Sequence, residues 1–375
     1  MAALVLAGFR LAWSGSAGAA APGGAAGPSE VWLVAGGDVT LGARLEEHLK
    51  ALAVDDGTLD PHGYPFARVA HHLRAADLAL VNLEGPLTAG GKRLPKNFNF
   101  RGSPHLAAAL ARAGIGAVSL ANNHTMDYGP EGLRDTLAAL AGEGIVAFGA
   151  GATLQAARRG VVVERRGVRI GLLGYLFLGE PSLEPRGVFA GPRRPGAAGH
   201  PASAAAVEAM VREDVGRLRP AADVVIVSFH WGREKRSEPE PYQRRLGRAA
   251  VEAGAGLVVG HHPHVIQGLE RYGGGLIAYS LGNFVFGGKW RPDDTDSILL
   301  KVRLTPAGVG GYQVVPITLG LYPHAPFQPV ELEGQEGARV LRRLSSLSAP
   351  LGAPRLGSGA WGRGSGVGDQ GSAKD

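Results

Sequence analysis

Six apolar runs, each followed by polar side chains, constrain the fold of this 375-residue chain more than any other feature. Near-continuous runs of Val, Ile and Leu are typical of strands covered on both faces, since neither face meets water. In open α/β sheets the ligand crevice lies beyond the carboxyl ends of the strands. The pattern therefore predicts that the polar side chains meet at one sheet edge. The runs and the polar residues after them are 31–35 with Asp38, 77–81 with Asn82 and Glu84, 115–120 with Asn122, Asn123 and His124, 224–227 with His230, 256–260 with His261, His262 and His264, and 276–279 with Asn283.

Helical patterns separate these runs. Apolar residues recur at three- and four-residue spacing over 43–53, 66–75, 104–113, 130–143, 204–218 and 242–253. Pro104 and Pro130 stand in the first turn of two of these segments, where proline is a common start signal. The alternation of strands and helices predicts an α/β fold. Beyond Ser297 two β-rich runs, 298–304 and 312–319, predict the closing strands of an antiparallel sheet.

The composition limits the kinds of site and partner. The chain contains no cysteine, which excludes disulfides and thiolate metal sites. Lysine and arginine number 39 and aspartate and glutamate 33, which gives a formal charge of +6. A polyanionic partner suits this charge, and so does an arginine-rich surface that has no partner. No nucleic-acid-binding motif accompanies the charge, so we expect no nucleic acid among the partners.

The two ends of the chain differ from its middle. Residues 1–11 are mildly apolar, and residues 14–28 are mostly small with several Ala-x-Ala sites. We expect residues 1–29 to be a secretory signal, which predicts an extracytoplasmic protein, secreted or associated with the cell envelope; a disordered leader on a cytoplasmic protein is the alternative. We expect one main domain over 30–325 and a C-terminal extension over 326–375. Gly, Ser, Pro and Arg dominate from about 345, so the extension is expected to be largely disordered from there.

The polar clusters contain the ligand types of a metal site. They offer carboxylates from Asp38 and Glu84, a side-chain carbonyl from Asn123, and imidazoles from His124, His230, His262 and His264. Oxygen and imidazole ligands without sulfur suit zinc, manganese or iron. The set is larger than one four-coordinate zinc ion needs, which predicts two metals sharing a bridging carboxylate and a bridging water. His262 and His264 flank Pro263, where a turn can aim them at neighbouring ions; we expect His261 to point elsewhere.

The same clusters form an ordered series of short motifs. They are Gly-Asp-Val-Thr-Leu-Gly at 37–42, Asn-Leu-Glu at 82–84, Asn-Asn-His at 122–124 with Asp127 and Gly129, His-Trp-Gly-Arg-Glu at 230–234, Gly-His-His-Pro-His-Val at 260–265 with Gln267, and Ser-Leu-Gly-Asn-Phe at 280–284. This series resembles the CapA family of bacterial capsule and poly-γ-glutamate synthesis proteins. That family is similar in turn to the calcineurin-like metallophosphoesterases. The resemblance extends over residues 30–321, most of the chain.

The resemblance implies a four-layer α/β/β/α sandwich of the metallo-dependent phosphatase type, with the site at one edge of its two sheets. It implies one or two divalent metal ions, whether manganese, zinc or iron. The implied ligands are Asp38 and His264 for the first metal, Glu84 as the bridge, and Asn123, His230 and His262 for the second.

The chain departs from the phosphoesterase pattern near the general acid and the first metal. His124 matches the histidine that protonates the leaving group. The acidic residue that orients this histidine in the phosphoesterases is replaced by Thr125, and Asp127 is the candidate substitute. Thr40 stands where the phosphoesterases have a ligand histidine, so the first metal loses a nitrogen donor. The longer Glu84 replaces a bridging aspartate.

Three further residues are candidates for substrate binding. Arg101 could hold a phosphate or carboxylate in a bidentate grip; the alternative is a solvated loop arginine. Glu234 could contact substrate or pair with a neighbouring arginine. Asn283 could bind substrate or shape a turn. Trp231 is expected to be a core anchor.

Three functional classes remain open. The first is a metal-dependent hydrolase that cleaves a phosphoester or a γ-glutamyl bond. The second is a non-catalytic component of capsule or poly-γ-glutamate assembly and export, and the third is a scaffold with a degenerate metal site. The resemblance implies an anionic cell-surface polymer or its precursor as partner, together with membrane-bound synthase or export subunits. A hydrolase predicts a compact pocket at the site, whereas a polymer-binding role predicts a long basic groove.

Overall fold

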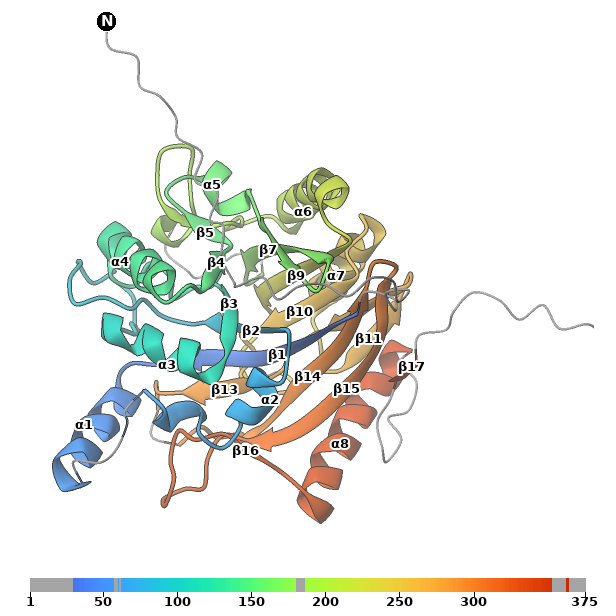
Figure 1. Cartoon of the computed structure of the whole chain (residues 1–375). Helices are drawn as coiled ribbons and strands as arrows, with labels where there is room; N and C mark the ends of the chain where they lie inside the picture. Colours follow the sequence, from blue (N-terminus) through green and yellow to red (C-terminus); the bar gives the residue numbers. More distant parts are fainter. Residues whose placement is uncertain are drawn as a thin grey trace, which may run out of the picture.

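The computed structural model describes residues 30–56, 60, 62–179, 186–289, 291–352 and 362–363 (Figure 1). The expected leader at 1–29 and most of the tail beyond Gly352 lie outside the described residues. Two large β-sheets form the centre of the described chain, and helices lie beside them. This arrangement confirms the α/β fold class predicted from the alternating pattern.

The first sheet has nine strands. β1, β2, β3 and β4 are parallel neighbours, so their carboxyl ends share one edge. β14 and β15 pair antiparallel beside β1, as the β-rich runs predicted. The strands are β1 (Val31–Thr40), β2 (Leu78–Leu83), β3 (Ile115–Ser119), β4 (Val146–Phe148), β13 (Asn283–Phe286), β14 (Asp296–Thr305), β15 (Gly308–Thr318), β16 (Val330–Glu331) and β17 (Gly362–Arg363).

The second sheet has six strands, in the order β11-β12-β10-β9-β7-β6. β7, β9, β10 and β12 are parallel, and antiparallel strands close both edges. β6 and β7 are not among the runs predicted from the sequence. The strands are β6 (Val161–Arg165), β7 (Val168–Phe177), β9 (Val224–Trp231), β10 (Leu257–His261), β11 (Leu269–Tyr272) and β12 (Gly275–Ala278); β5 (Ala150–Gly151) and β8 (Gly196–Ala197) form a separate pair.

Successive residues of the central strands belong to different hydrophobic clusters. Leu33 of β1 packs in a buried cluster that also contains Ile226 and Leu257 of the second sheet. The next residue, Val34, packs instead in a cluster with helical residues such as Leu110. Strand side chains alternate between the two faces of a sheet, so this division places apolar side chains on both faces of β1. That double burial is why the strand sequence is a continuous apolar run.

Helices cover the remaining apolar faces of both sheets (Figure 1). The cluster beside the first sheet includes residues of α1 (Arg44–Asp56), α2 (Ala70–Arg74), α3 (Ala107–Ala113) and α4 (Gly129–Gly142). The cluster beside the second sheet includes residues of α5 (Leu154–Arg158), α6 (Ala204–Leu218) and α7 (Pro241–Glu252). Short 3-10 helices lie at η1 (Tyr64–Phe66), η2 (Pro104–Leu106), η3 (Arg186–Val188) and η4 (Arg219–Ala221).

Local start signals explain most helix positions, and one predicted helix is interrupted. Pro130 lies in the first turn of α4, and α7 begins with a capping box between Glu240 and Gln243. The segment predicted as one helix over 66–75 is instead η1 followed by α2. Between them Val69 has φ −124° and ψ −5°, outside the helical region, so the helix starts again at Ala70.

A C-terminal helix, α8 (Gly334–Ser348), was not predicted from the sequence. Its buried residues Val340 and Leu344 join the cluster between the sheets. The helix passes through Ser345, near which we expected disorder to begin, and η5 (Ala349–Leu351) follows it. Arg339 and Arg343 on α8 form ion pairs with Asp296 of β14. Within the part of the chain that the structure describes, no helix has the length and apolar character to cross a membrane.

Candidate functional site

The carboxyl ends of strands from both sheets bring the predicted ligands together. Asp38 lies in β1 just past a register shift between Ala35 and Asp38. Such an irregularity re-aims side chains. A Cβ on Gly37 would lie 1.9 Å from the carbonyl oxygen of Gly282, so only glycine allows this close approach of β1 to the segment before β13. The bulge and the tight packing fix the position of Asp38.

Two groups of possible metal ligands share the Glu84 carboxylate. The Asp38 group consists of Asp38, Glu84 and His264, and the His230 group consists of Glu84, His230 and His262. Within each group the candidate ligand atoms all lie within 4.8 Å of one another. Glu84 belongs to both groups, and the two-metal scheme with Glu84 as the bridging carboxylate stays a prediction.

Distances within the groups show how closely the side chains converge. His264 Nδ1 lies 3.4 Å from Asp38 Oδ2, and His264 Nε2 lies 3.8 Å from Glu84 Oε1. His230 Nε2 lies 3.7 Å from Glu84 Oε1 and 3.1 Å from His262 Nδ1. Four of these five side chains are buried, and His264 is 17% exposed. The site therefore opens to solvent on the His264 side.

Glu84 is the least satisfied carboxylate of the two ligand groups. Its side chain is fully buried, and neither carboxylate oxygen accepts a hydrogen bond from the described residues. Burial is the main cause that raises the pKa of Glu84 to about 8. A buried carboxylate without donors is destabilising, whereas a bound cation would compensate both oxygens. The donor set therefore fits a divalent metal.

The histidines of the His230 group are suited to metal ligation. Burial lowers the pKa of His230 well below its usual value and that of His262 to about 3. Both imidazoles are therefore neutral at physiological pH, which is the form that binds metals. Burial raises the pKa of Asp38, but the imidazoles of His261 and His264, which lie 3.3 and 3.4 Å from its oxygens, outweigh this effect and hold the pKa well below its usual value.

The turn after β10 has a strained backbone. His262 and His264 have φ of 95° and 58°, in the left-handed region that non-glycine residues seldom adopt. The turn allows the His262 backbone N–H to donate to Asp38 Oδ2 at 3.1 Å. Our expectation that His261 points elsewhere is wrong, because its Nδ1 lies 3.3 Å from Asp38 Oδ1. His261 is the last residue of β10, and its side chain is buried. Backbone strain such as that at His262 and His264 often accompanies functional sites.

A second cluster joins His124 to Asp127 and Lys96. His124 Nδ1 lies 2.7 Å from Asp127 Oδ2, and Lys96 Nζ lies 2.9 Å from Asp127 Oδ1. The Phe100 backbone N–H also donates to Asp127, at 2.6 Å. The other ring nitrogen, His124 Nε2, lies 3.9 Å from Glu84 Oε1. Asp127 thus contacts the His124 imidazole, whereas the Thr125 hydroxyl donates to the Leu120 carbonyl oxygen. Lys96 links this cluster to the loop in which it lies.

Sequence reasoning gave no role to two asparagines that link the ligands. Asn82 donates to Asp38 Oδ1 at 2.8 Å and lies 3.3 Å from His230 Nδ1. Asn122 donates to Asn82 Oδ1 at 3.1 Å and to the Leu83 carbonyl oxygen at 2.8 Å. Both stand in the strand-end motifs, so their positions were visible in the sequence. Their hydrogen-bonding partners could not be predicted from the sequence, because the partners depend on the pairing of β2 with β1 and β3.

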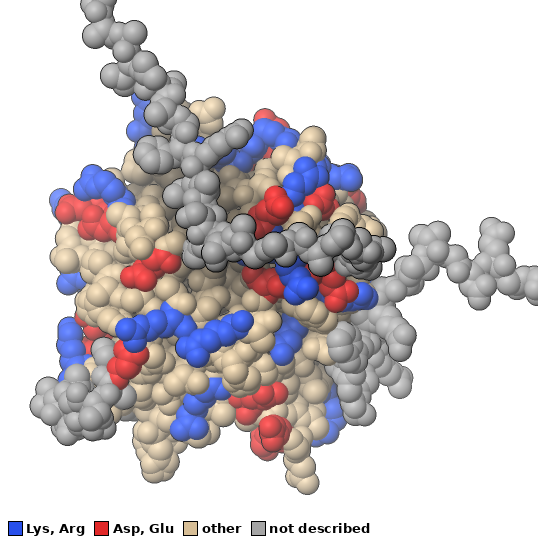
Figure 2. Space-filling view, in the orientation of Figure 1, with Lys and Arg blue, Asp and Glu red and all other residues tan. Residues whose placement is uncertain are grey.

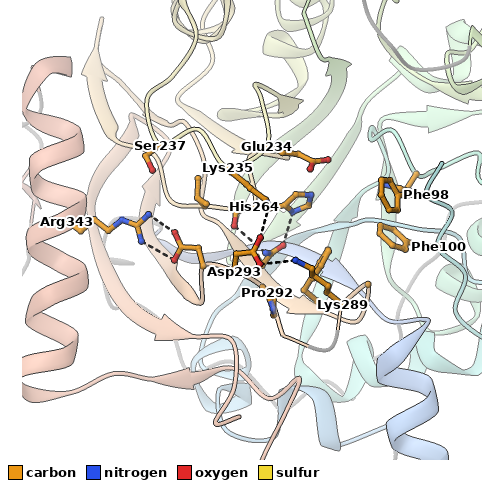
Figure 3. Close-up of a pocket in the computed structure, with 16 residues that line it drawn as sticks. Phe98, Phe100, Glu234, Lys235, Ser237, His264, Lys289, Pro292, Asp293 and Arg343 are labelled. Carbon is orange, nitrogen blue, oxygen red and sulfur yellow. Dashed lines mark hydrogen bonds and ion pairs between the residues drawn. The ribbon is translucent and has the colours of Figure 1, made fainter. Parts of the chain in front are cut away.

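Asn123 and the three proposed substrate residues have different surroundings. Asn123 is buried beside His124, and its backbone carbonyl accepts from Lys96 Nζ at 2.7 Å. Glu234 and Asn283 line a cavity of about 480 Å³ beside His264 (Figure 3). Asn283 Oδ1 lies 2.8 Å from His264 Nδ1, so it contacts a candidate ligand directly.

Arg101 and Trp231 are placed differently. The guanidinium of Arg101 lies over the ring of Tyr128, 4.6 Å from its centre, and Arg101 is not among the residues that line this cavity. Trp231 is fully buried, stacks on Phe229 and donates to the Tyr279 carbonyl oxygen. It is the core anchor that we expected. Arg101 is therefore not placed to hold a ligand in this cavity with a bidentate contact.

Another group of possible metal ligands lies away from this site. His72 Nε2 lies 2.8 Å from Glu331 Oε2, and His71 Nε2 lies 3.9 Å from the same oxygen. The His71 side chain is 63% exposed, and Glu331 is 36% exposed. In contrast to Glu84, Glu331 has a hydrogen-bonding partner and access to water. We call His71, His72 and Glu331 the peripheral group and use it as a control for the buried groups that contain Glu84.

Comparisons with known proteins agree with the motif series. Residues 32–288 match the family described as "Bacterial capsule synthesis protein PGA_cap". The chain is 32% identical over 312 residues to the "PGA biosynthesis protein CapA" of Bacillus subtilis (strain 168), covering 82% of this chain and 76% of that protein. It is 31% identical over 287 residues to the "Capsule biosynthesis protein CapA" of Bacillus anthracis, covering 76% of this chain and 66% of that protein.

A relative from another genus matches over a shorter region. The chain is 36% identical over 214 residues to a "Probable polyglutamine synthesis accessory protein" of Mycobacterium tuberculosis (strain ATCC 25618 / H37Rv), covering 56% of each protein. The chain therefore spans less than two thirds of the length of this relative and of the Bacillus anthracis protein. Since the family match covers most of the chain and the strand-end motifs lie within it, the chain belongs to the bacterial capsule synthesis protein PGA_cap family, the CapA family.

Proposed function

We propose that the chain is a metal-dependent hydrolase that acts on a cell-surface polymer or its precursor. One or two divalent ions, whether manganese, zinc or iron, bind to Asp38, Glu84, Asn123, His230, His262 and His264. Glu84 carries this proposal, because it is buried, lacks hydrogen-bond donors and belongs to both ligand groups. A carboxylate shared by two sets of imidazoles is the arrangement that a two-metal hydrolase uses.

The fold proposed with this function is the four-layer α/β/β/α sandwich. Three buried clusters support it: one between the two sheets and one between each sheet and its helices. Such a sandwich places the carboxyl ends of β1 and β2 against those of β9 and β10, so ligands from both sheets face a common site. The main domain then includes residues 30–325, and α8 packs against it as part of the C-terminal extension.

The side chains around the ligands have separable roles in this proposal. Bound cations would polarise the scissile group and lower the pKa of a bound water. Asp127 holds His124 Nδ1, so that His124 Nε2 faces the site and donates a proton to the leaving group. Lys96 fixes Asp127 from the other side. The cavity beside His264 has a volume of about 480 Å³, which is the size of a small-molecule site and favours a hydrolase over a long binding groove.

The substrate and partners follow from the family. The relatives' names refer to PGA, capsule and polyglutamine synthesis. We therefore propose poly-γ-glutamate or a related anionic polymer as the substrate, cleaved at a γ-glutamyl bond or at a phosphoester of its precursor. Membrane-bound synthase or export subunits are the proposed partners. The signal-like composition of 1–29 supports a location outside the cytoplasm, secreted or at the cell envelope.

A non-catalytic polymer-binding role is the second candidate, and Thr40 favours it. Thr40 is buried and its hydroxyl makes no hydrogen bond within the described residues, and it supplies no imidazole to the Asp38 group. The Asp38 group thus has only its three side-chain ligands, which weakens metal binding there. In this case the site would hold polymer without cleaving it.

A hydrolysis assay separates the two candidates. Purified protein with Mn²⁺, Zn²⁺ or Fe²⁺ is incubated with a γ-glutamyl oligomer and with an aryl phosphate, and products are quantified. We expect turnover with at least one metal, and a loss of about 10²- to 10⁴-fold in His124→Asn, since general acid catalysis contributes that much. His105→Asn, an exposed histidine outside the site, should keep full activity. Metal-loaded protein that binds oligomer but turns over neither substrate would contradict the hydrolase.

A further inference from the structure

The cavity beside the metal ligands has two chemically different walls. Phe98 and Phe100 lie on the side of His264 that is opposite to Asp293 and Arg343 (Figure 3). Phe98 is 72% exposed, which is unusual for a large apolar side chain and leaves its ring available to a ligand. The other wall is charged. A ligand that fills the cavity must therefore offer apolar surface to one wall and polar groups to the other.

Two lysines on the charged wall share one carboxylate. Lys235 Nζ lies 2.6 Å from Asp293 Oδ2, and Lys289 Nζ lies 2.9 Å from Asp293 Oδ1. This trio carries one more positive than negative charge. Its side chains are between 55% and 68% exposed, and ion pairs of that exposure are weak, so a ligand anion can displace Asp293. Hydrogen bonds from Lys235 and Lys289 lower the pKa of Asp293 to about 2, so this carboxylate is ionised and both lysines act on it.

The other charged residues of the cavity form no ion pair, within the described residues, with the two lysines that carry the surplus positive charge. Arg343 is already paired with Asp294 at 2.6 Å and with Asp296 at 2.9 Å. The Glu234 carboxylate points toward the space between His264 and Phe98, and no ion pair within the described residues joins it to either lysine (Figure 3). Asp293 is the main cause that raises the pKa of Lys235, and the charge of Glu234 adds to it without a direct ion pair. The surplus positive charge of the lysine trio therefore remains at the cavity wall.

The backbone holds Lys235 beside the metal ligands. Lys235 has φ of 62°, a left-handed conformation that a lysine seldom adopts. Its backbone N–H donates to the Pro263 carbonyl oxygen at 2.8 Å, in the same turn that carries His262 and His264. The turn that positions the ligand histidines thus also positions this ammonium group. A strained residue that the fold retains at a cavity wall is a candidate for a functional role.

We propose that Lys235 and Lys289 form a carboxylate-binding subsite for the anionic polymer, with Phe98 and Phe100 packing on its methylene groups. This inference rests on the proposed function and identifies the unit that the site recognises. A γ-glutamyl unit has one free carboxylate and a short methylene segment, so it offers both chemistries that the walls require. The lysines thus take the anion-binding role that the sequence suggested for Arg101.

Binding of a defined γ-glutamyl oligomer, measured by calorimetry, tests this subsite. Lys235→Gln and Lys289→Gln should each weaken binding about 3- to 10-fold, since each removes one solvent-exposed charge, and pairs of exposed charges contribute little individually. Asp293→Asn should tighten binding, because it removes the carboxylate that competes with the ligand. The matched controls are Lys50→Gln and Glu47→Gln, exposed members of ion pairs on α1, which should leave affinity unchanged. The affinity of the native chain should fall as salt concentration rises.

Two further ligands distinguish the source of the anion. An oligomer whose free carboxylates are converted to amides should bind at least 10-fold more weakly than the acid form. Inorganic phosphate, used as a competitor, tests whether the subsite prefers phosphate. Equal affinity for acid and amide oligomers, or a lysine dependence seen for phosphate but not for the oligomer, would overturn the proposal.

The measurement is made with Mn²⁺ and again with a chelator, and the metal content of each variant is determined. The lysine variants should retain the metal content of the native chain. A lysine effect that persists in chelator supports the subsite even if the proposed metal chemistry fails. Identical oligomer binding in the lysine variants and their controls overturns the subsite and leaves the metal proposal standing.

Discussion

Glu84 connects the stability of this protein with its proposed function at the level of one residue. Its carboxylate is buried without hydrogen-bond donors, and it lies within 4 Å of imidazole nitrogens of His230, His264 and His124. A buried charge without full compensation destabilises a fold. A metal-binding role predicts that Glu84 lowers the stability of the fold without metal and raises it when a cation is bound.

Replacement of this carboxylate should therefore have opposite effects in the two states. In chelator at pH 7, below the raised pKa of about 8, Glu84 takes up a proton when the chain folds. Glu84→Gln needs no proton, so it is expected to increase the free energy of unfolding by about 1–2 kcal/mol. With metal present the native chain should be the more stable of the two, since binding adds to its stability. Urea denaturation in both conditions measures this, with the exposed Glu47→Gln as control. A Glu84→Gln chain that is less stable in chelator would contradict this interpretation.

Sequence alone identified the residue types of the site but only part of their geometry. The strand-end motifs singled out the five side chains of the two ligand groups. They gave no role to Asn82 or Lys96 and assigned His261 to the wrong direction. Side-chain direction depends on where β10 ends and on the strained turn after it, and neither is set by local spacing.

At the level of elements, the loops and the C-terminal helix complete what the strands begin. α8 was missed because its surroundings in the sequence are rich in Gly, Ser and Arg, and its apolar face is narrow. Tertiary contacts stabilise it: Val340 and Leu344 are buried, and Arg343 lines the cavity beside His264. β7 was missed although it is a long apolar run, because no cluster of possible ligands follows it.

The ion pairs of α8 with β14 predict an acid-sensitive attachment. Asp296 accepts from Arg339 at 2.6 and 2.7 Å and from Arg343 at 2.9 Å. Burial raises the pKa of Asp296, but these hydrogen bonds outweigh it and hold the pKa below 3.8. A depressed folded-state pKa stabilises the fold above the unfolded-state value, and this contribution is lost as pH falls through the folded-state value.

Asp296→Asn should therefore destabilise the chain by about 1 kcal/mol at neutral pH and by less in acid, below the pKa of the folded form. Hydrogen exchange of residues 334–348 should accelerate in parallel. Glu336→Gln is the matched control, because it removes an exposed partner of the same Arg339 and should change stability by less than about 0.5 kcal/mol. Equal effects of both variants, or an Asp296 effect that does not depend on pH, would be inconsistent with this attachment.

At the scale of the whole molecule, the arrangement of two parallel strand sets explains why the site could be anticipated. β1 and β2 are parallel neighbours in one sheet, and β9 and β10 are parallel neighbours in the other. The five side chains of the two ligand groups lie at or just beyond the carboxyl ends of these strands. The alternating strand and helix pattern predicted the fold class and the sheet-edge site. It could not predict how the sheets face each other, because that depends on contacts between residues distant in sequence, such as Leu33 and Leu257.

The surface of the molecule agrees with the interpretation that its net positive charge reflects an arginine-rich surface that has no partner. On the face drawn in Figure 2, Lys and Arg side chains are interspersed with Asp and Glu. Many of the arginines form ion pairs, for example Arg158 with Asp214 and Arg212 with Glu252. We therefore propose that the lysines of the cavity recognise an anionic polymer, and that the formal charge of +6 does not.

The metal content of the purified chain tests the central claim most directly. After equilibration with Mn²⁺, Zn²⁺ or Fe²⁺ and removal of free ions, elemental analysis should find one or two ions per chain. Glu84→Gln should lose the metal of both groups, and the double variant His262→Ala, His264→Ala should lose it likewise. His72→Ala, which alters the peripheral group, should retain it. Equal metal content in the native chain and Glu84→Gln, or none in either, would contradict a metal site built around Glu84.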